Sequence, residues 1–189
     1  MPPNARSADP RPIRVGISAC LLGQKVRYDG GHKRDPGLLA NLGRVFEWVP
    51  VCPEVELGLG TPRPPLRLEG DPRAPRLMFV ESREEITRMM RDWSRRRLEA
   101  LEAADLCGFV LKRDSPSCGL ERVPVHRARG GPARRAGSGL FAAALRKRFP
   151  RLPLEEGERL HDTGARRRFI ERVRAYRRRR DAAAAPAAR

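Results

Sequence analysis

The chain has 189 residues, of which 40% are hydrophobic and 33% charged, which suits one domain of about 150 residues and excludes a wholly disordered chain. No apolar run approaches the roughly 18 residues of a membrane span, and residues 1–12 lack the apolar core of a secretory signal, so we expect a cytoplasmic protein with no membrane partner. The formal net charge of +17 rests almost wholly on arginine, which is as typical of GC-rich coding as of phosphate binding, so charge alone does not establish a nucleic-acid partner.

The predicted strands are short apolar segments bounded by turn-forming residues. They lie at 13–18, 46–51, 64–69, 76–80 and 106–111. The pair 64–69 and 76–80 flanks Gly70-Asp71-Pro72, which indicates a hairpin. Residues 106–111 are continuously apolar, which is typical of a buried strand.

The predicted helices lie at 36–42, 82–104, 140–148 and 164–180. The first opens with an N-cap and a proline, Asp35-Pro36, and the second with a capping box, Ser82 and Glu85. A glycine-rich loop at 130–139 leads into the third. The second helix carries a stripe that we assign to the core: Ile86, Met89, Met90, Trp93 and Leu98. The last helix places four apolar residues on one face: Phe169, Ile170, Val173 and Tyr176.

Strands that alternate with helices predict an α/β fold: a single domain with a mostly parallel sheet flanked by helices, Rossmann-like. We expect residues 1–12 to be a disordered leader, 13–180 to be the domain and 181–189 to be a disordered tail. Nine arginines lie in 166–180, and we expect Arg177–Arg180 to be a solvated helix end that the chemistry does not need. We expect a monomer.

Three of the four cysteines follow predicted strands. Cys20 comes after 13–18, Cys52 comes after 46–51, and Cys118 lies in the loop after 106–111. Because ligands bind beyond the carboxyl ends of parallel strands, these thiols are predicted to converge at one edge of the sheet. Cys107 lies inside an apolar segment and is predicted to be a small buried residue.

Three converging thiols fit several kinds of site. A 4Fe-4S cluster with three protein ligands would leave one iron open for a substrate. A structural zinc ion would need a fourth ligand such as His32 or His126. Redox-active thiols, or a cysteine nucleophile with a histidine base, would need no metal. The spacing favours the cluster and leaves the other sites open.

Groups suited to acid–base chemistry adjoin these cysteines. Glu54 is two residues after Cys52, and Ser115 and Ser117 lie in the S-P-S-C-G segment of Cys118. A carboxylate beside a metal centre could deprotonate water, and a hydroxyl could relay a proton or bind a substrate. The simpler alternative is a structural role, in which Glu54 caps a turn and the serines bond to nearby backbone.

Two further features could bind a phosphate. Gly137-Ser138-Gly139 precedes a helix, and backbone N–H groups at a helix N-terminus attract anions. A plain helix entry is the competing interpretation. Arg27 and Arg63 could bind the same phosphate.

Six motifs follow one another between residues 13 and 177. They are I-S-A-C-L-L-G, V-R-Y-D-G, V-C-P-E-V-E-L-G-L-G-T-P-R-P-P, L-K-R-D-S-P-S-C-G, G-S-G-L-F-A-A-A-L and the closing L-H-D with R-R-F-I-E-R-V-R-A-Y. In this order they resemble the thiouracil desulfidase family. The resemblance implies a 4Fe-4S cluster held by Cys20, Cys52 and Cys118, whose remaining iron binds the sulfur of a thiolated uracil.

The implied activity is removal of that sulfur as sulfide, without net redox change, from 2-thiouracil or a thiouridine nucleotide. Glu54 matches the catalytic carboxylate of the family, and Ser115 matches its active-site serine. We expect substrate contacts from four residues: Arg27, Ser117, Gly137 and Ser138. Two alternatives are a desulfidase acting on thiouridine in tRNA and a non-catalytic, metal-containing RNA-binding module. A steep salt dependence would indicate an RNA substrate.

Overall fold

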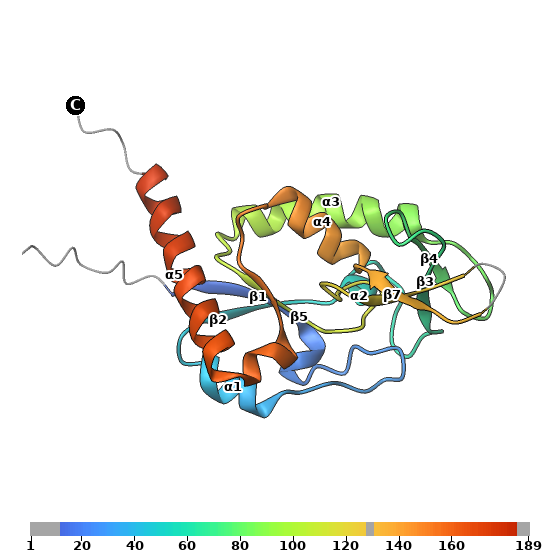
Figure 1. The fold of residues 1–189 in the computed structure, drawn as a ribbon, viewed down its shortest axis with the longest axis horizontal. Helices are drawn as coiled ribbons and strands as arrows, with labels where there is room; N and C mark the ends of the chain where they lie inside the picture. Colours follow the sequence, from blue (N-terminus) through green and yellow to red (C-terminus); the bar gives the residue numbers. More distant parts are fainter. Residues whose placement is uncertain (1–11, 128–130, 185–189) are drawn as a thin grey trace, which may run out of the picture.

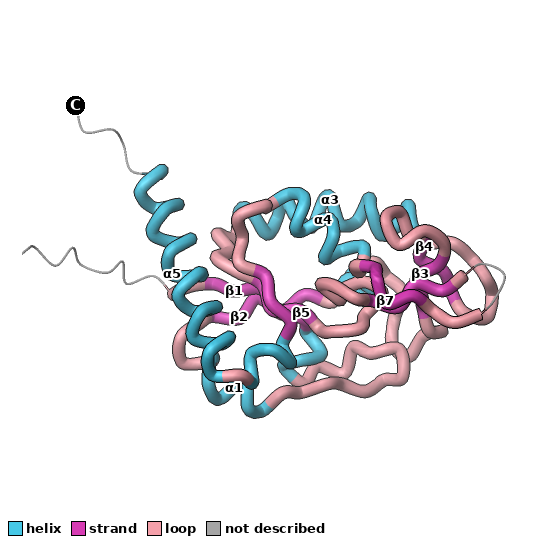
Figure 2. The backbone as a smooth tube through the Cα atoms, viewed as in Figure 1, coloured by secondary structure: helices cyan, strands magenta, loops and turns pink. Residues whose placement is uncertain are grey.

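The computed structural model describes residues 12–127 and 131–184 (Figure 1). Its strands form two four-stranded sheets, which lie side by side in Figure 2. The first sheet is parallel, in the order β2-β1-β5-β8: β1 (Arg14–Ser18), β2 (Glu47–Val51), β5 (Phe109–Leu111) and β8 (Leu154–Glu156). The second is mixed, in the order β4-β3-β6-β7: β3 (Leu66–Glu69), β4 (Arg76–Phe79), β6 (Val123–His126) and β7 (Arg134–Gly137).

Helices cover both faces of the parallel sheet (Figure 1). They are α1 (Pro36–Leu42), α2 (Pro53–Glu56), α3 (Thr87–Ala103), α4 (Leu140–Arg148) and α5 (Thr163–Ala184), with short 3-10 helices η1 (Ala19–Leu22) and η2 (Gly157–His161). The predicted α/β fold with a parallel sheet flanked by helices is confirmed. Among the described residues no helix is long and apolar enough to cross a membrane.

The core consists of two clusters, one on each face of the parallel sheet. Successive side chains of a strand point to opposite faces, so Phe109 and Leu111 pack with α3 and α4, whereas Val110 packs with α1 and α5. All three residues of β5 are buried, as the continuous apolar run predicts. Cys107 is also buried, and it lies in the cluster with α1 and α5, against which the half-buried Cys20 also packs.

Gly16 of β1 has no side chain, and the aromatic ring of Phe109 packs directly against its Cα. A Cβ atom at this position would lie 2.2 Å from Cδ2 of Phe109. The ring is fully buried against Phe141, with the ring centroids 5.6 Å apart, so it has little room to move.

We therefore expect Gly16→Ala to lower the free energy of unfolding by about 1–3 kcal/mol, because overpacking forces side chains off their rotamers. Urea denaturation measures this change. The matched control is Gly37→Ala in α1, where the nearest atom would lie 3.5 Å from the new Cβ and the helix favours alanine. Equal stability of the two variants would contradict the packing argument.

The start of α3 differs from the predicted capping box. The helix begins at Thr87, and Glu85 forms an isolated antiparallel bridge with Met78 instead of reaching back to Ser82. The hydroxyl of Thr87 accepts a hydrogen bond from the N–H of Leu77 at 2.8 Å. Pairing with β4 therefore prevents a helical start at residue 82. The predicted apolar stripe is buried except for Met89, which is exposed.

The glycine-rich segment predicted as a loop before α4 contains strand β7, which pairs with β6. Residue 130 of that segment lies outside the described residues. The predicted hairpin of β3 and β4 is confirmed, and the parallel pairing of β3 with β6 extends it into the second sheet. The sequence did not predict β6 or β7.

Helix α5 continues to Ala184, four residues past its predicted end at 180. The expectation of a solvated end at Arg177–Arg180 is wrong for two of these arginines. Arg177 is buried and pairs with Asp181 at 2.6 Å, and Arg180 donates to the backbone oxygen of Asp105 at 2.6 Å. The expected leader at 1–12 and the end of the expected tail, 185–189, lie almost wholly outside the described residues.

Because Arg177 is buried and Arg180 joins α5 to Asp105, removing all residues after Tyr176 should destabilise the protein. We expect a loss of about 1–3 kcal/mol in the free energy of unfolding. Thermal denaturation of the truncated chain measures this loss. Arg179→Gln is the control, since Arg179 is exposed. An unchanged melting temperature after truncation would restore the sequence-based expectation of a dispensable helix end.

Candidate functional site

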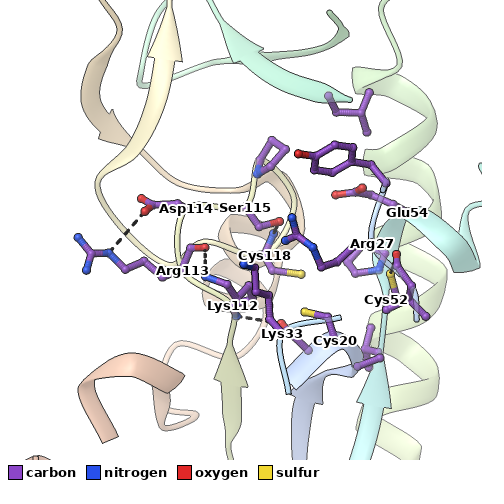
Figure 3. A pocket seen from close by; sticks show the side chains of 18 of the residues that line it. Cys20, Arg27, Lys33, Cys52, Glu54, Lys112, Arg113, Asp114, Ser115 and Cys118 are labelled. Carbon is purple, nitrogen blue, oxygen red and sulfur yellow. Dashed lines mark hydrogen bonds and ion pairs between the residues drawn. The ribbon is translucent and has the colours of Figure 1, made fainter. Parts of the chain in front are cut away.

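A cavity of about 400 Å³ opens beyond the carboxyl ends of the parallel strands (Figure 3). Strands β1, β2 and β5 are adjacent and parallel, so the segments that follow them meet at this edge. Pro65 and Leu66, at the start of β3, contribute lining from the second sheet. The lining residues labelled in Figure 3 are Cys20, Arg27, Lys33, Cys52, Glu54, Lys112, Arg113, Asp114, Ser115 and Cys118.

The three cysteines predicted to converge all line this cavity. Cys20 lies in η1 directly after β1, Cys52 is the N-cap of α2 directly after β2, and Cys118 lies in the turns after β5. Figure 3 shows their sulfur atoms around one space. All three are free thiols, of which Cys118 is buried and the other two are half-buried.

Burial makes these thiols weak acids. It raises the pKa of Cys20 to about 11, with a further contribution from the nearby Cys52 and an opposing one from Lys112 and Arg27. Burial also raises the pKa of Cys52, and it raises the pKa of Cys118 well above its ordinary range. The three groups are therefore protonated at neutral pH in the chain alone, and binding iron as thiolates would release their protons.

The arrangement bears on the kind of metal centre. Among the described residues no three His, Cys, Asp or Glu side chains are close enough together to bind one metal ion. The histidines considered as a fourth zinc ligand, His32 and His126, do not line the cavity. A cluster takes one thiolate per iron and so suits three thiols spread around a cavity better than a single zinc ion does.

Glu54 is held at the cavity wall by two side chains. It is the second residue of α2, and its side chain is 13% exposed. Arg63 donates to its Oε2 from Nε at 2.9 Å and from Nη2 at 2.6 Å. The hydroxyl of Ser117 donates to its Oε1 at 2.8 Å. Glu54 therefore has a fixed position among the cysteines rather than the turn-capping role that was the simpler alternative.

The two serines have different surroundings. Ser115 lines the cavity, and its Oγ accepts the N–H groups of Ser117 at 3.2 Å and Cys118 at 3.0 Å. Ser117 is fully buried and is not among the cavity-lining residues. Ser115 is thus placed to meet a substrate and also shapes the turn of Cys118, whereas Ser117 reaches the site through Glu54.

The structure separates the residues expected to bind phosphate. Arg27 lines the cavity and pairs with Asp29 at 3.1 Å. Gly137 and Ser138 do not line it, and the hydroxyl of Ser138 donates to the backbone oxygen of Leu120 at 2.8 Å. A Cβ atom at Gly139 would lie 2.5 Å from the backbone of Ser117. This segment therefore packs against the backbone of the Cys118 loop and does not line the cavity.

Sequence reasoning missed three features of the site. Arg63 contacts Glu54 of α2 from a loop nine positions later in the chain, and the sequence had suggested a phosphate contact for Arg63 instead. Lys33 lines the cavity and carried no motif signal of its own. Tyr28 also lines it, with its ring exposed and the Arg27 guanidinium 5.3 Å from the ring centroid. For Tyr28, the available sequence signal was its place in the V-R-Y-D-G motif.

The cavity residues fall within a segment shared with a known family. A model of the 2-thiouracil desulfurase family matches residues 15–157, more than half of the chain. The chain belongs to the 2-thiouracil desulfurase family. The matched segment includes all three cavity cysteines and Glu54 and ends before α5, so the closing motif of the sequence lies outside it.

Two known proteins are similar to this desulfurase-family chain over most of its length. A solved structure of the 4Fe-4S-dependent thiouracil desulfidase TudS superimposes with a TM-score of 0.64 at 32% identity, covering 79% of this chain and 94% of that one. The uncharacterized protein YbbK of Bacillus subtilis (strain 168) is 27% identical over 136 residues, which are 69% of this chain and 88% of YbbK.

Proposed function

We propose that this chain is an enzyme that removes sulfur from a thiolated uracil at a 4Fe-4S cluster, without net redox change. The observation that carries the proposal is one cavity lined by three free thiols and a fixed carboxylate. Membership of the 2-thiouracil desulfurase family and the similarity to TudS support it. We place the activity in the cytoplasm and in a monomer.

Cys20, Cys52 and Cys118 would hold the cluster. Three thiol donors on one cavity match a cluster that leaves one iron without a protein ligand. When bound, the cluster supplies a Lewis-acidic iron suited to the soft sulfur of a thiocarbonyl group. The net reaction is hydrolysis: thiouracil and water give uracil and hydrogen sulfide, with no electron gained or lost.

Glu54 and Ser115 are the residues that we assign to the chemistry. Glu54 would accept a proton from the water that attacks the thiocarbonyl carbon, since general-base catalysis needs a carboxylate fixed within reach of that water. Ser115 lines the same cavity and would bind the pyrimidine edge or return a proton to the leaving sulfur. Ser117 contributes indirectly, by its hydrogen bond to Glu54.

The charges of the lining favour a thiouridine nucleotide among the substrates of this class. Arg27, Lys33 and Lys112 all line the cavity, and Lys112 is paired with Glu158 at 2.7 Å. A phosphate carried into the site would meet several cations. The cavity volume of about 400 Å³ is in the range of small-molecule sites.

The test is a substrate panel on anaerobically reconstituted protein, scored by sulfide release: 2-thiouracil, 4-thiouracil, a thiouridine monophosphate and thiolated tRNA. We expect release from the free base or the nucleotide. Release from tRNA alone, with a steep dependence on salt, would favour the tRNA alternative. RNA binding without sulfide release from any substrate would favour the non-catalytic module.

A further inference from the structure

The guanidinium of Arg63 is one of the most enclosed charges near the cavity, with its side chain 3% exposed. Besides its two bonds to Glu54, it donates to the backbone oxygens of Gly60 at 2.8 Å and Val26 at 3.0 Å, and to Oγ1 of Thr61 at 3.3 Å. These partners come from the loop before Arg63 and from the loop that carries Arg27 and Tyr28. Arg63 is therefore fixed on several sides, and so is the carboxylate that it contacts.

The hydrogen bonds leave the two oxygens of Glu54 in different states. A carboxylate offers about four lone-pair positions, two on each oxygen. Both positions on Oε2 are used by Arg63. On Oε1 one is used by the hydroxyl of Ser117, which leaves one open. Oε1 is thus the oxygen that can accept a further proton.

Building on the proposed function, we propose that Arg63 is a positioning residue for desulfuration: it fixes Glu54 so that Oε1 receives the proton of the attacking water. Arg63 lines the cavity, but its N–H groups already donate to protein acceptors, so it acts through Glu54 rather than on the reacting atoms. This assignment replaces the phosphate contact that the sequence suggested for Arg63.

The planar guanidinium is essential to this role. Its Nε and Nη2 approach one carboxylate oxygen together, which an ammonium group on a flexible chain does not reproduce. Arg63→Lys keeps the charge and loses the paired contact. A displacement of about 1 Å in a catalytic group can cost about a hundredfold in rate.

In reconstituted protein with 2-thiouracil, we expect Arg63→Lys to lower kcat by about 10- to 100-fold. KM should stay within about threefold, because the change affects the transition state rather than substrate binding. The dissociation constant of uracil, measured by calorimetry, should also be unchanged. Thr61→Val is the matched control: it removes a bond of Arg63 that does not go to Glu54. A similar loss of kcat in Thr61→Val would overturn the proposal.

A double-mutant cycle separates positioning from a general structural effect. In a Glu54→Gln background, Arg63→Lys should have little further effect, because the carboxylate through which it acts is gone. Multiplying losses would overturn the role of Arg63 and leave the proposed function standing. Near-normal turnover of Glu54→Gln alone would instead refute Glu54 as the base, which belongs to the proposed function.

Should Arg63→Lys fail to fold, hydrogen exchange at the arginine side chain in the full chain gives a second test. The Nε–H of Arg63 is buried in its bond to Glu54 and should exchange slowly with solvent in a 1H-15N spectrum. Glu54→Ala, which removes the acceptor altogether, should speed that exchange. No slow arginine Nε–H signal in the unsubstituted chain, or one that Glu54→Ala leaves unchanged, would contradict the fixed contact between Arg63 and Glu54.

Discussion

Protein reconstituted without oxygen should be brown and hold about four irons and four labile sulfides per chain. The cluster should be lost in each of three variants: Cys20→Ser, Cys52→Ser and Cys118→Ser. Each of these thiols follows a different strand and lines the same cavity, so none can replace another. A serine hydroxyl is a poor ligand for iron in a sulfur-rich centre. Iron and sulfide analysis, with the visible absorption spectrum, measures the loss.

Cys107→Ser is the matched control. It is buried and does not line the cavity, and its thiol donates to the backbone oxygen of Asp105 at 3.5 Å. We expect this variant to bind iron normally and to lose only some stability. A stable zinc protein that takes up no iron would contradict the cluster, and iron loss in Cys107→Ser would show that the ligand set is wrong.

Glu54→Gln should keep the cluster but lower kcat by about 10²- to 10⁴-fold, the usual size of a general-base contribution. The amide oxygen can still accept the hydrogen bonds of Arg63 at the Oε2 position, and the amide NH2 at the Oε1 position can donate to the hydroxyl of Ser117, so the local structure should hold. It cannot take a proton from water. Steady-state sulfide release, normalised to iron content, measures the effect.

Glu47→Gln is the control for this prediction. Glu47 lies at the opposite end of β2, where it pairs with Arg14 at 3.2 Å on the surface. An exposed pair of this kind contributes little to stability, so turnover should be unchanged. If Glu54→Gln were as active as Glu47→Gln, the contacts of Glu54 would be purely structural.

Local sequence signals predicted the elements that they fully determine. The Asp35-Pro36 start of α1 is observed, with the Asp35 carboxylate accepting from the N–H of Leu38 at 2.9 Å. The convergence of three cysteines followed from one rule about parallel strands, and the structure agrees. In each case the position of a residue follows from the helix or strand directly beside it in the sequence.

Features that depend on distant contacts were predicted poorly. The start of α3 is decided by pairing with β4, and the end of α5 is joined to the domain by the contact of Arg180 with Asp105, 75 positions earlier. Strand β6 owes its place to β3, more than fifty residues earlier in the chain, where Leu68 is paired with Val125. The periodicity of a single segment does not contain this information.

In the candidate site, too, residues beside a predicted strand were located from the sequence, whereas contacts between distant segments were not. The sequence located Cys52 and Glu54 because they adjoin one strand end. It could not show that Arg63 and Ser117 contact Glu54, since that requires two loops to fold back on α2. Nor could it show that Ser138 faces Leu120 rather than the cavity.

The most direct test of cluster-dependent, non-redox desulfuration is the product balance of a single anaerobic reaction without any reductant. Reconstituted protein and the same chain without its cluster are each given 2-thiouracil or a thiouridine monophosphate, and uracil or uridine monophosphate is quantified beside sulfide. We predict equal amounts of the two products over many turnovers with the reconstituted protein, and none with the cluster-free chain. Product formation by the cluster-free chain, or turnover that requires a reductant, would contradict the proposed function.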